Sequence, residues 1–297
     1  MAEKLETELS HKIKKLNIFT KRLITTRLVG RYRSRVKGKG LEFSNYREYT
    51  LEDDSNLIDW KASIRVNEPI IKEFVEERNL EVFFLIDVSS SMVFGSTKKL
   101  KNEYVTELVA TLTYSVLRVG DSVGYCFFSD KIFNLNPPSH NKKLFYIISS
   151  SLLNPDIYGG TYDFELALKK ITRLLKKNTI LIIISDFIGL KKGWEDYLKK
   201  AAYKFDTIGI MVRDPRDKEL PEDSDMILIS DPYTNEKMIL DPNINVRQRY
   251  KHYVENQEKE IESIFTESRA SFLKLTTDKE FFVPIINFFK RRQKWSQ

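Results

Sequence analysis

The sequence predicts an α/β protein with a doubly wound, mainly parallel sheet that carries helices on both faces, plus an N-terminal extension. Three observations support this prediction. From Glu81 onward, short apolar runs alternate with longer amphipathic stretches. The short runs are apolar at successive positions, which is typical of strands buried on both faces of a parallel sheet. Two of these runs end in aspartates, Asp87 and Asp186, at the strand ends where such folds bind ligands.

The first part of the chain, residues 1–79, is expected to form a basic extension made of a helix and a small β/loop region. Apolar residues spaced by three or four predict an amphipathic helix over 3–29, closed by Gly30. A basic, glycine-containing loop follows at 31–40, and the apolar run within 68–77 predicts a short strand.

The remainder, residues 80–297, is expected to form the α/β domain. Strands are predicted at 82–87, 122–128, 180–185, 207–212, 226–230 and 271–275. Helices are predicted at 98–119, 142–153, 164–176, 194–203, 246–267 and 281–292. Strands that alternate with helices need crossover connections, and these produce a parallel sheet.

The composition is that of a soluble globular protein: of 297 residues, 41% are hydrophobic and 31% are charged. The single cysteine, Cys126, excludes an intramolecular disulfide and lies in an apolar stretch, so we expect a buried thiol. The most apolar run, 179–185, is far shorter than the roughly 20 residues that a spanning helix needs. The N-terminus has no apolar secretory core. We therefore expect a cytoplasmic protein without a membrane span.

Positive charge is concentrated in an N-terminal arm between His11 and Gly40. This arm holds eleven Lys and Arg residues and no acidic residue, so the net charge of +7 leaves −4 for the rest of the chain. Such an arm could contact phosphate or an acidic partner, or fold back on the acidic body. Because no nucleic-acid-binding module is visible, direct nucleic-acid binding remains an alternative and not our first prediction.

Polar residues gather where three loops leave the predicted sheet. Asp87, Ser89 and Ser91 alternate along the loop after the first buried strand, and helix capping alone would explain them. A second loop holds two glycines before Thr161, which allow the backbone to approach closely. A third loop begins at Asp186, after the most apolar strand. Two carboxylates and three hydroxyls can therefore meet at one edge of the sheet.

This set of oxygen donors suits a hard divalent cation. Mg²⁺ prefers octahedral geometry at about 2.0–2.1 Å and retains waters, so a few protein oxygens suffice. Three hydroxyls add no formal charge, so the cation stays electrophilic at an open position. An Asp or Glu of another protein is a natural sixth ligand. We expect Mg²⁺, for which Mn²⁺ can substitute.

The constellation resembles the metal-ion-dependent adhesion site of von Willebrand factor type A domains. The preceding run resembles the leader of one intracellular bacterial branch, domain of unknown function 58, with its Arg-x-Tyr, Gly-Asp-Asp and Ile-Asp-Trp series. The counterparts are Arg47, Tyr49, Asp53, Asp54, Ile58, Asp59 and Trp60, with Glu52 in place of the usual glycine. The resemblance extends over roughly residues 38–292.

The resemblance implies a site and a partner. It makes Asp87, Ser89, Ser91, Thr161 and Asp186 the five metal-site residues. In these domains the hydroxyls usually bind the ion directly, and the aspartates often bind through water. Family members are thought to act as adaptors of MoxR-type AAA+ ATPases, so the resemblance implies a protein-interaction module with such a partner.

An enzymatic function is the other alternative, as a metal-dependent hydrolase. A phosphatase of the haloacid-dehalogenase type needs a second aspartate two residues after its nucleophile, and the chain has Ser89 there. Metal-assisted hydrolysis lacks a general base apart from the presumed ligands. The histidines, His11, His140 and His252, match no zinc spacing. We therefore predict no catalytic residue and a protein that is not an enzyme.

Overall fold

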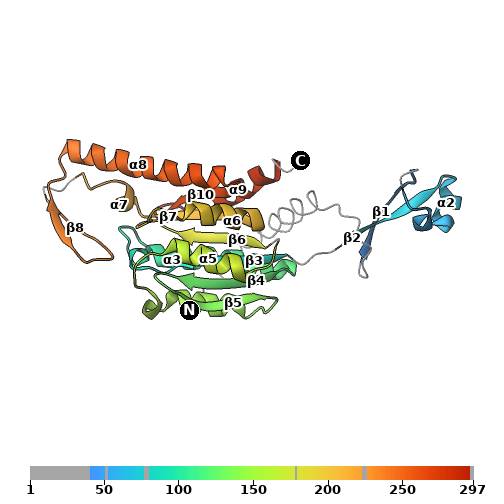
Figure 1. Ribbon diagram of the computed structural model, residues 1–297, viewed down its shortest axis with the longest axis horizontal. Coiled ribbons are helices and arrows are strands. Elements are labelled where there is room, and N and C mark those ends of the chain that lie inside the picture. The colour runs from blue at the N-terminus through green and yellow to red at the C-terminus, as the bar shows by residue number, and fades with distance from the viewer. Residues whose placement is uncertain (1–40, 51–52, 77–79, 178, 223–225, 295–297) are drawn as a thin grey trace. The chain divides into compact units, whose positions relative to one another are not determined.

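The computed structural model describes residues 41–50, 53–76, 80–177, 179–222 and 226–294 (Figure 1). These residues form two compact units, which separate between Asn79 and Leu80. The helix predicted over 3–29 and the basic arm lie outside the described residues. The boundaries of the extension, 1–79, and of the α/β domain, 80–297, therefore stay predictions.

The smaller unit is a two-stranded antiparallel sheet with a helix inserted between its strands. Strand β1 (Leu41–Glu48) pairs with β2 (Ile70–Glu76). Between them lie a single 3-10 turn (Ser55–Leu57) and helix α2 (Trp60–Val66). The Asp59 side chain accepts hydrogen bonds from the first backbone N–H groups of α2 and so starts this helix. Only β2 was predicted from the sequence.

Ionic side chains of the leader motif hold this smaller unit together. The guanidinium of Arg47 donates two hydrogen bonds, of 2.7 and 2.6 Å, to the two carboxylate oxygens of Asp53. Asp53 also accepts the backbone N–H of Thr50. The Lys72 ammonium lies 2.8 Å from Asp59. These motif residues therefore fix the loop and the helix start between the two strands.

The larger unit contains a six-stranded sheet in the order β10-β7-β6-β3-β4-β5. The strands are β3 (Glu81–Asp87), β4 (Ser122–Phe128), β5 (Ile132–Ser139), β6 (Ile180–Ser185), β7 (Asp206–Arg213) and β10 (Ser271–Thr276). All neighbouring pairs are parallel except β4 and β5, which are antiparallel. The expected mainly parallel sheet is confirmed.

Helices cover both faces of this sheet (Figure 1). They are α3 (Lys101–Val119), α4 (Leu144–Leu153), α5 (Phe164–Leu174), α6 (Glu195–Lys204), α7 (Pro215–Lys218), α8 (Ile244–Glu267) and α9 (Phe282–Lys294). In β3, Phe84 and Ile86 face the core under α3, α4 and α9, whereas Phe83 and Leu85 face the core under α5, α6 and α8. This alternation explains why the buried strands are apolar at every position, and it confirms the doubly wound fold class.

Two elements differ from the expectation. Strand β5 was not predicted, because its sequence contains Pro137 and Pro138, which are tolerated only at a sheet edge. The strand expected at 226–230 does form, as β8 (Ile227–Ser230), but it pairs with β9 (Lys237–Leu240) in a separate hairpin. Its side chains alternate between half-buried and exposed, whereas a central strand of this sheet is buried on both faces.

The sheet has a topological switch point between β3 and β6. From β3 the chain moves to β4 on one side, and it returns later to β6 on the other side. Connections that leave two adjacent parallel strands in opposite directions open a crevice at the carboxyl ends of those strands. Asp87 ends β3, and Asp186 follows β6 directly. Both predicted site aspartates therefore lie at this crevice.

Candidate functional site

The loop after β3 brings a buried carboxylate and two buried hydroxyls together. Asp87 is 0% exposed. One of its oxygens accepts the Ser89 N–H at 2.8 Å, and the other accepts the Ser185 hydroxyl at 2.6 Å. The Oγ atoms of Ser89 and Ser91 lie 3.2 Å apart. The alternating spacing predicted from the sequence thus turns these side chains toward one buried point.

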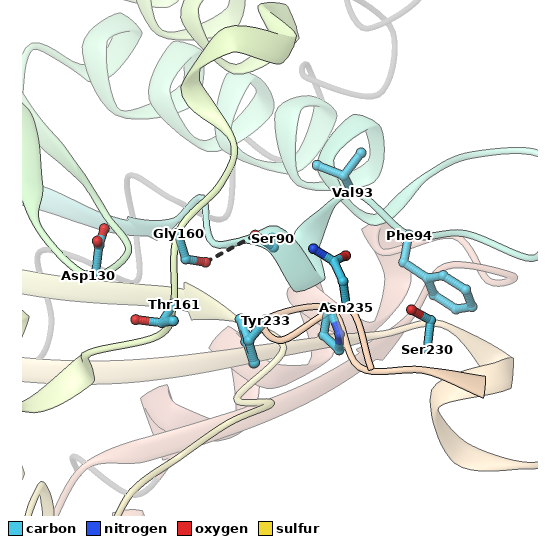
Figure 2. Close-up of a pocket in the computed structure, with 10 residues that line it drawn as sticks. Ser90, Val93, Phe94, Asp130, Gly160, Thr161, Ser230, Tyr233 and Asn235 are labelled. Atoms are coloured by element: carbon cyan, nitrogen blue, oxygen red, sulfur yellow. Dashed lines mark hydrogen bonds between the residues drawn. The ribbon is translucent and has the colours of Figure 1, made fainter. Parts of the chain in front are cut away.

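The glycine-rich loop before α5 lies directly against the loop after β3. The Gly159 N–H donates to the Val88 carbonyl, and the Ser90 hydroxyl donates to the Gly160 carbonyl at 3.1 Å (Figure 2). Gly160 has φ +78°, and a Cβ there would lie 2.6 Å from the Asp130 carboxylate. Only glycine fits this position without strain.

Thr161 stands apart from the buried serines. Its backbone is placed at the site by the preceding Gly160, but its side chain is exposed and lines a pocket. In Figure 2 its hydroxyl points away from Ser90. The structure therefore brings Thr161 to the crevice without joining its hydroxyl to the Asp87 cluster.

Asp186 is also 0% exposed, and it forms an ion pair with a lysine. One carboxylate oxygen accepts the Ile188 N–H at 2.9 Å, and the other accepts the Lys101 ammonium at 2.7 Å. Lys101 is 1% exposed, and it donates a second hydrogen bond, of 2.8 Å, to Asp217. Sequence reasoning missed Lys101 and Asp217, because they come from α3 and α7 and no spacing rule links them to Asp186.

The site holds three carboxyl groups and one buried ammonium, and burial disfavours negative charge on two of the carboxyl groups. Burial and the nearby Asp186 raise the pKa of Asp87 to about 7. Burial also raises the pKa of Asp217, while Asp186 and Asp217 raise the pKa of Lys101 against the opposing effect of its own burial. When ionised, the three carboxylates and the one ammonium of this cluster sum to −2. One divalent cation would neutralise them.

A residue from the β8–β9 turn completes the site. The Tyr233 hydroxyl lies 3.1 Å from Ser91 Oγ and 2.8 Å from the Ile188 carbonyl oxygen. Its ring lies over Gly189, where a Cβ would come within 2.6 Å of a ring carbon. Burial raises the pKa of Tyr233, which therefore stays protonated. No sequence signal identified this residue, since it lies 142 positions from Ser91.

A pocket of about 560 Å³ adjoins these loops (Figure 2). It is lined by Ser90, Val93, Phe94, Asp130, Gly160, Thr161, Ser230, Pro232, Tyr233 and Asn235. Among the described residues, no group of three or more His, Cys, Asp and Glu side chains could hold a metal ion. The oxygen donors at this crevice are instead two carboxylates together with hydroxyls.

Fold and site together define an α/β protein with a polar cluster at the switch point of a doubly wound sheet. The chain belongs to the family described as "Protein of unknown function DUF58", whose model matches residues 45–260. The uncharacterized protein Rv1480 of Mycobacterium tuberculosis is 23% identical over 294 residues, which cover 97% of this chain and 91% of that protein. An uncharacterized Mycobacterium avium protein, MAV169, is 26% identical over 44% of this chain and 77% of its own length.

The fold is supported by a similar solved structure with a TM-score above 0.5. The hypothetical protein BatB from Bacteroides thetaiotaomicron superposes with a TM-score of 0.51 at 16% identity, over 72% of this chain and 99% of that one. The VWA domain of SpRpn10 gives a TM-score of 0.39 at 9% identity, over 71% of this chain and 95% of that domain. In the described part of the chain, no helix combines the length and hydrophobicity required to cross a membrane.

Proposed function

We propose that this protein is a non-enzymatic interaction module that binds Mg²⁺ at the crevice between β3 and β6. The ion's open coordination position would engage an acidic side chain of a partner protein. The observation that carries this proposal is the buried cluster of oxygen donors from Asp87, Ser89, Ser91 and Asp186. When fully ionised together with Lys101 and Asp217, this cluster would carry a charge of −2, which one divalent cation would balance.

The donor set fits such an ion. Ser89 and Ser91 offer two neighbouring hydroxyl oxygens, and Thr161 supplies a third after rotation of its side chain. Asp87 and Asp186 supply charge, directly or through water. When bound, the cation supplies a Lewis-acidic position that attracts a carboxylate. Mn²⁺ serves the same purpose and is a convenient probe.

The kind of partner is proposed from the resemblance of the sequence motifs. Because the leader and metal motifs resemble those of the MoxR-associated branch, we propose a MoxR-type AAA+ ATPase as the partner and a cytoplasmic adaptor role for this protein. A partner loop that presents Asp or Glu would enter the pocket beside Thr161 and Ser90. No second function is favoured by a particular observation on the described residues.

The proposal is tested by Mn²⁺ titration calorimetry and by capture of a purified MoxR-type ATPase with Mg²⁺ or with EDTA. We expect the wild-type protein to bind Mn²⁺ and to retain the ATPase only when the cation is present. Asp87→Ala should remove both properties, whereas the exposed Asp241→Ala should keep them. Capture that survives Asp87→Ala and EDTA would contradict the bridging mechanism. Turnover of a generic phosphoester by the Mg²⁺-loaded protein would favour a hydrolase instead.

A further inference from the structure

The β8–β9 turn reaches the loop after β3 from a separate part of the fold. It lies on the chain between α7 and α8, yet the Tyr233 hydroxyl is within hydrogen-bonding distance of both Ser91 Oγ and the Ile188 carbonyl. Ile188 is two residues after Asp186, and its N–H donates to Asp186. One hydroxyl thus joins the loop after β3 to the loop after β6.

Contacts outside the loop after β3 fix the position of Tyr233. The Asp231 carboxylate accepts the N–H groups of Tyr233 and Thr234, at 2.7 and 2.9 Å, which shapes the turn. The aromatic ring lies over Gly189, where no Cβ could fit. The turn and the ring packing therefore hold the hydroxyl at the site in addition to its own hydrogen bonds.

The direction of these hydrogen bonds follows from the number of protons. A phenol has one proton and a carbonyl oxygen can only accept. When Tyr233 donates to the Ile188 carbonyl, its oxygen is left to accept from Ser91. The Ser91 oxygen then accepts from Ser89, 3.2 Å away. Both serine protons point along this relay, so the Ser91 oxygen keeps one free lone pair and the Ser89 oxygen keeps two.

We infer that Tyr233 is a positioning residue of the proposed cation site, because it orients the hydroxyls of Ser91 and Ser89 so that their lone pairs face the ion. The inference rests on the proposed function. Without the phenol oxygen, the Ser91 proton can turn toward the ion and weaken its coordination. Outer partners of this kind typically change metal affinity by about 10–100-fold.

The test is Mn²⁺ titration of Tyr233→Phe, which retains the ring over Gly189 and removes only the hydroxyl. We expect Mn²⁺ affinity to fall about tenfold, with the unfolding midpoint of the metal-free protein nearly unchanged. Tyr253→Phe, on an exposed stretch of α8, is the matched control and should bind as the wild type does. Thr234→Ala alters the same turn at an exposed side chain and should also retain affinity.

Ser91→Ala serves as a background variant. It distinguishes the loss of hydroxyl orientation from a general loosening of the β8–β9 turn. Ser91→Ala itself should weaken Mn²⁺ binding, and adding Tyr233→Phe should then have no further effect, because the oxygen that Tyr233 orients is gone. Equal affinity of Tyr233→Phe and wild type would overturn the inference while leaving the proposed function intact. A loss in Thr234→Ala as large as that in Tyr233→Phe would also overturn it. Absence of Mn²⁺ binding by the wild type would remove both proposals.

Discussion

The ammonium of Lys101 lies 2.7 Å from the Asp186 carboxylate, in an ion pair whose two side chains are 1% and 0% exposed. Lys101 also forms an ion pair with Asp217. The Lys101 ammonium at the start of α3 therefore links the loop after β6 to α7. If the proposed cation binds beside it, Asp186 would share its charge between Lys101 and that ion, as expected of a ligand that acts through water.

Replacing Lys101 by Met should destabilise the fold by about 3–5 kcal/mol, because the substitution leaves the buried Asp186 and the half-buried Asp217 without their cation. Urea unfolding of the metal-free protein measures this change. Lys176→Met is the control, since that side chain is 83% exposed, and it should change stability by no more than about 0.5 kcal/mol. A Lys101→Met protein as stable as the wild type would show that the buried pair contributes no net stability.

The raised pKa of Asp87 predicts a pH dependence. The folded-state pKa of about 7 lies above the ordinary value of 3.8, so the folded protein binds this proton more tightly than the unfolded chain. The contribution of Asp87 to stability is therefore largest at low pH and is lost as pH rises through 7. Because a cation must displace the proton, Mn²⁺ should bind more tightly at about pH 8 than at about pH 5.5.

Thermal unfolding with and without Mn²⁺ across this pH range checks the Asp87 prediction. Asp87→Asn is the matched variant: it should abolish Mn²⁺-dependent stabilisation and also flatten the part of the pH profile that Asp87 causes. If the metal-free wild type and Asp87→Asn lose stability in parallel as pH rises, Asp87 does not titrate in this range.

Gly160 should not tolerate a side chain. Gly160→Ala places a Cβ 2.6 Å from the Asp130 carboxylate and forces alanine to adopt φ +78°. We expect a loss of more than about 1 kcal/mol in the free energy of unfolding. Adding Asp130→Ala should recover part of this loss, because it removes the contact but not the unfavourable φ. Full recovery in the double variant would show that backbone strain is negligible here.

Thr161 should affect cation binding but not stability. Its side chain is exposed, so Thr161→Val should leave metal-free stability within about 0.5 kcal/mol of the wild type. Loss of its hydroxyl should still weaken Mn²⁺ binding, if the side chain rotates onto the ion as proposed. Calorimetric Mn²⁺ titration of Thr161→Val, with Ser91→Ala measured for comparison, tests this. An unchanged Mn²⁺ affinity of Thr161→Val would exclude Thr161 as a ligand.

Much of the larger unit could be predicted from the sequence, because strands buried on both faces are apolar at successive positions. Strands β4 and β6 have the predicted bounds, and the ends of α3 and α8 lie within three residues of those expected. Strand β5 was missed because its two prolines suggest a loop. The strand at 226–230 was misplaced in the sheet because an isolated hairpin strand and a short sheet strand have similar patterns.

The sequence predicts site residues only where they lie close together along the chain. Asp87, Ser89 and Ser91 follow one another along a single loop, so their convergence is a local property. Lys101 and Tyr233 reach the site through tertiary packing, and the residues next to them in the sequence indicate no role. The outer hydrogen-bond partners of the site therefore needed the structure.

The outermost strand β5 contains Pro137 and Pro138 in succession. Along a strand, successive N–H groups point alternately inward to the neighbouring strand and outward to solvent. Two adjacent prolines delete one donor of each kind, so β5 is a poor template for a further extended peptide. This border of the sheet is thereby protected against strand exchange and fibril growth.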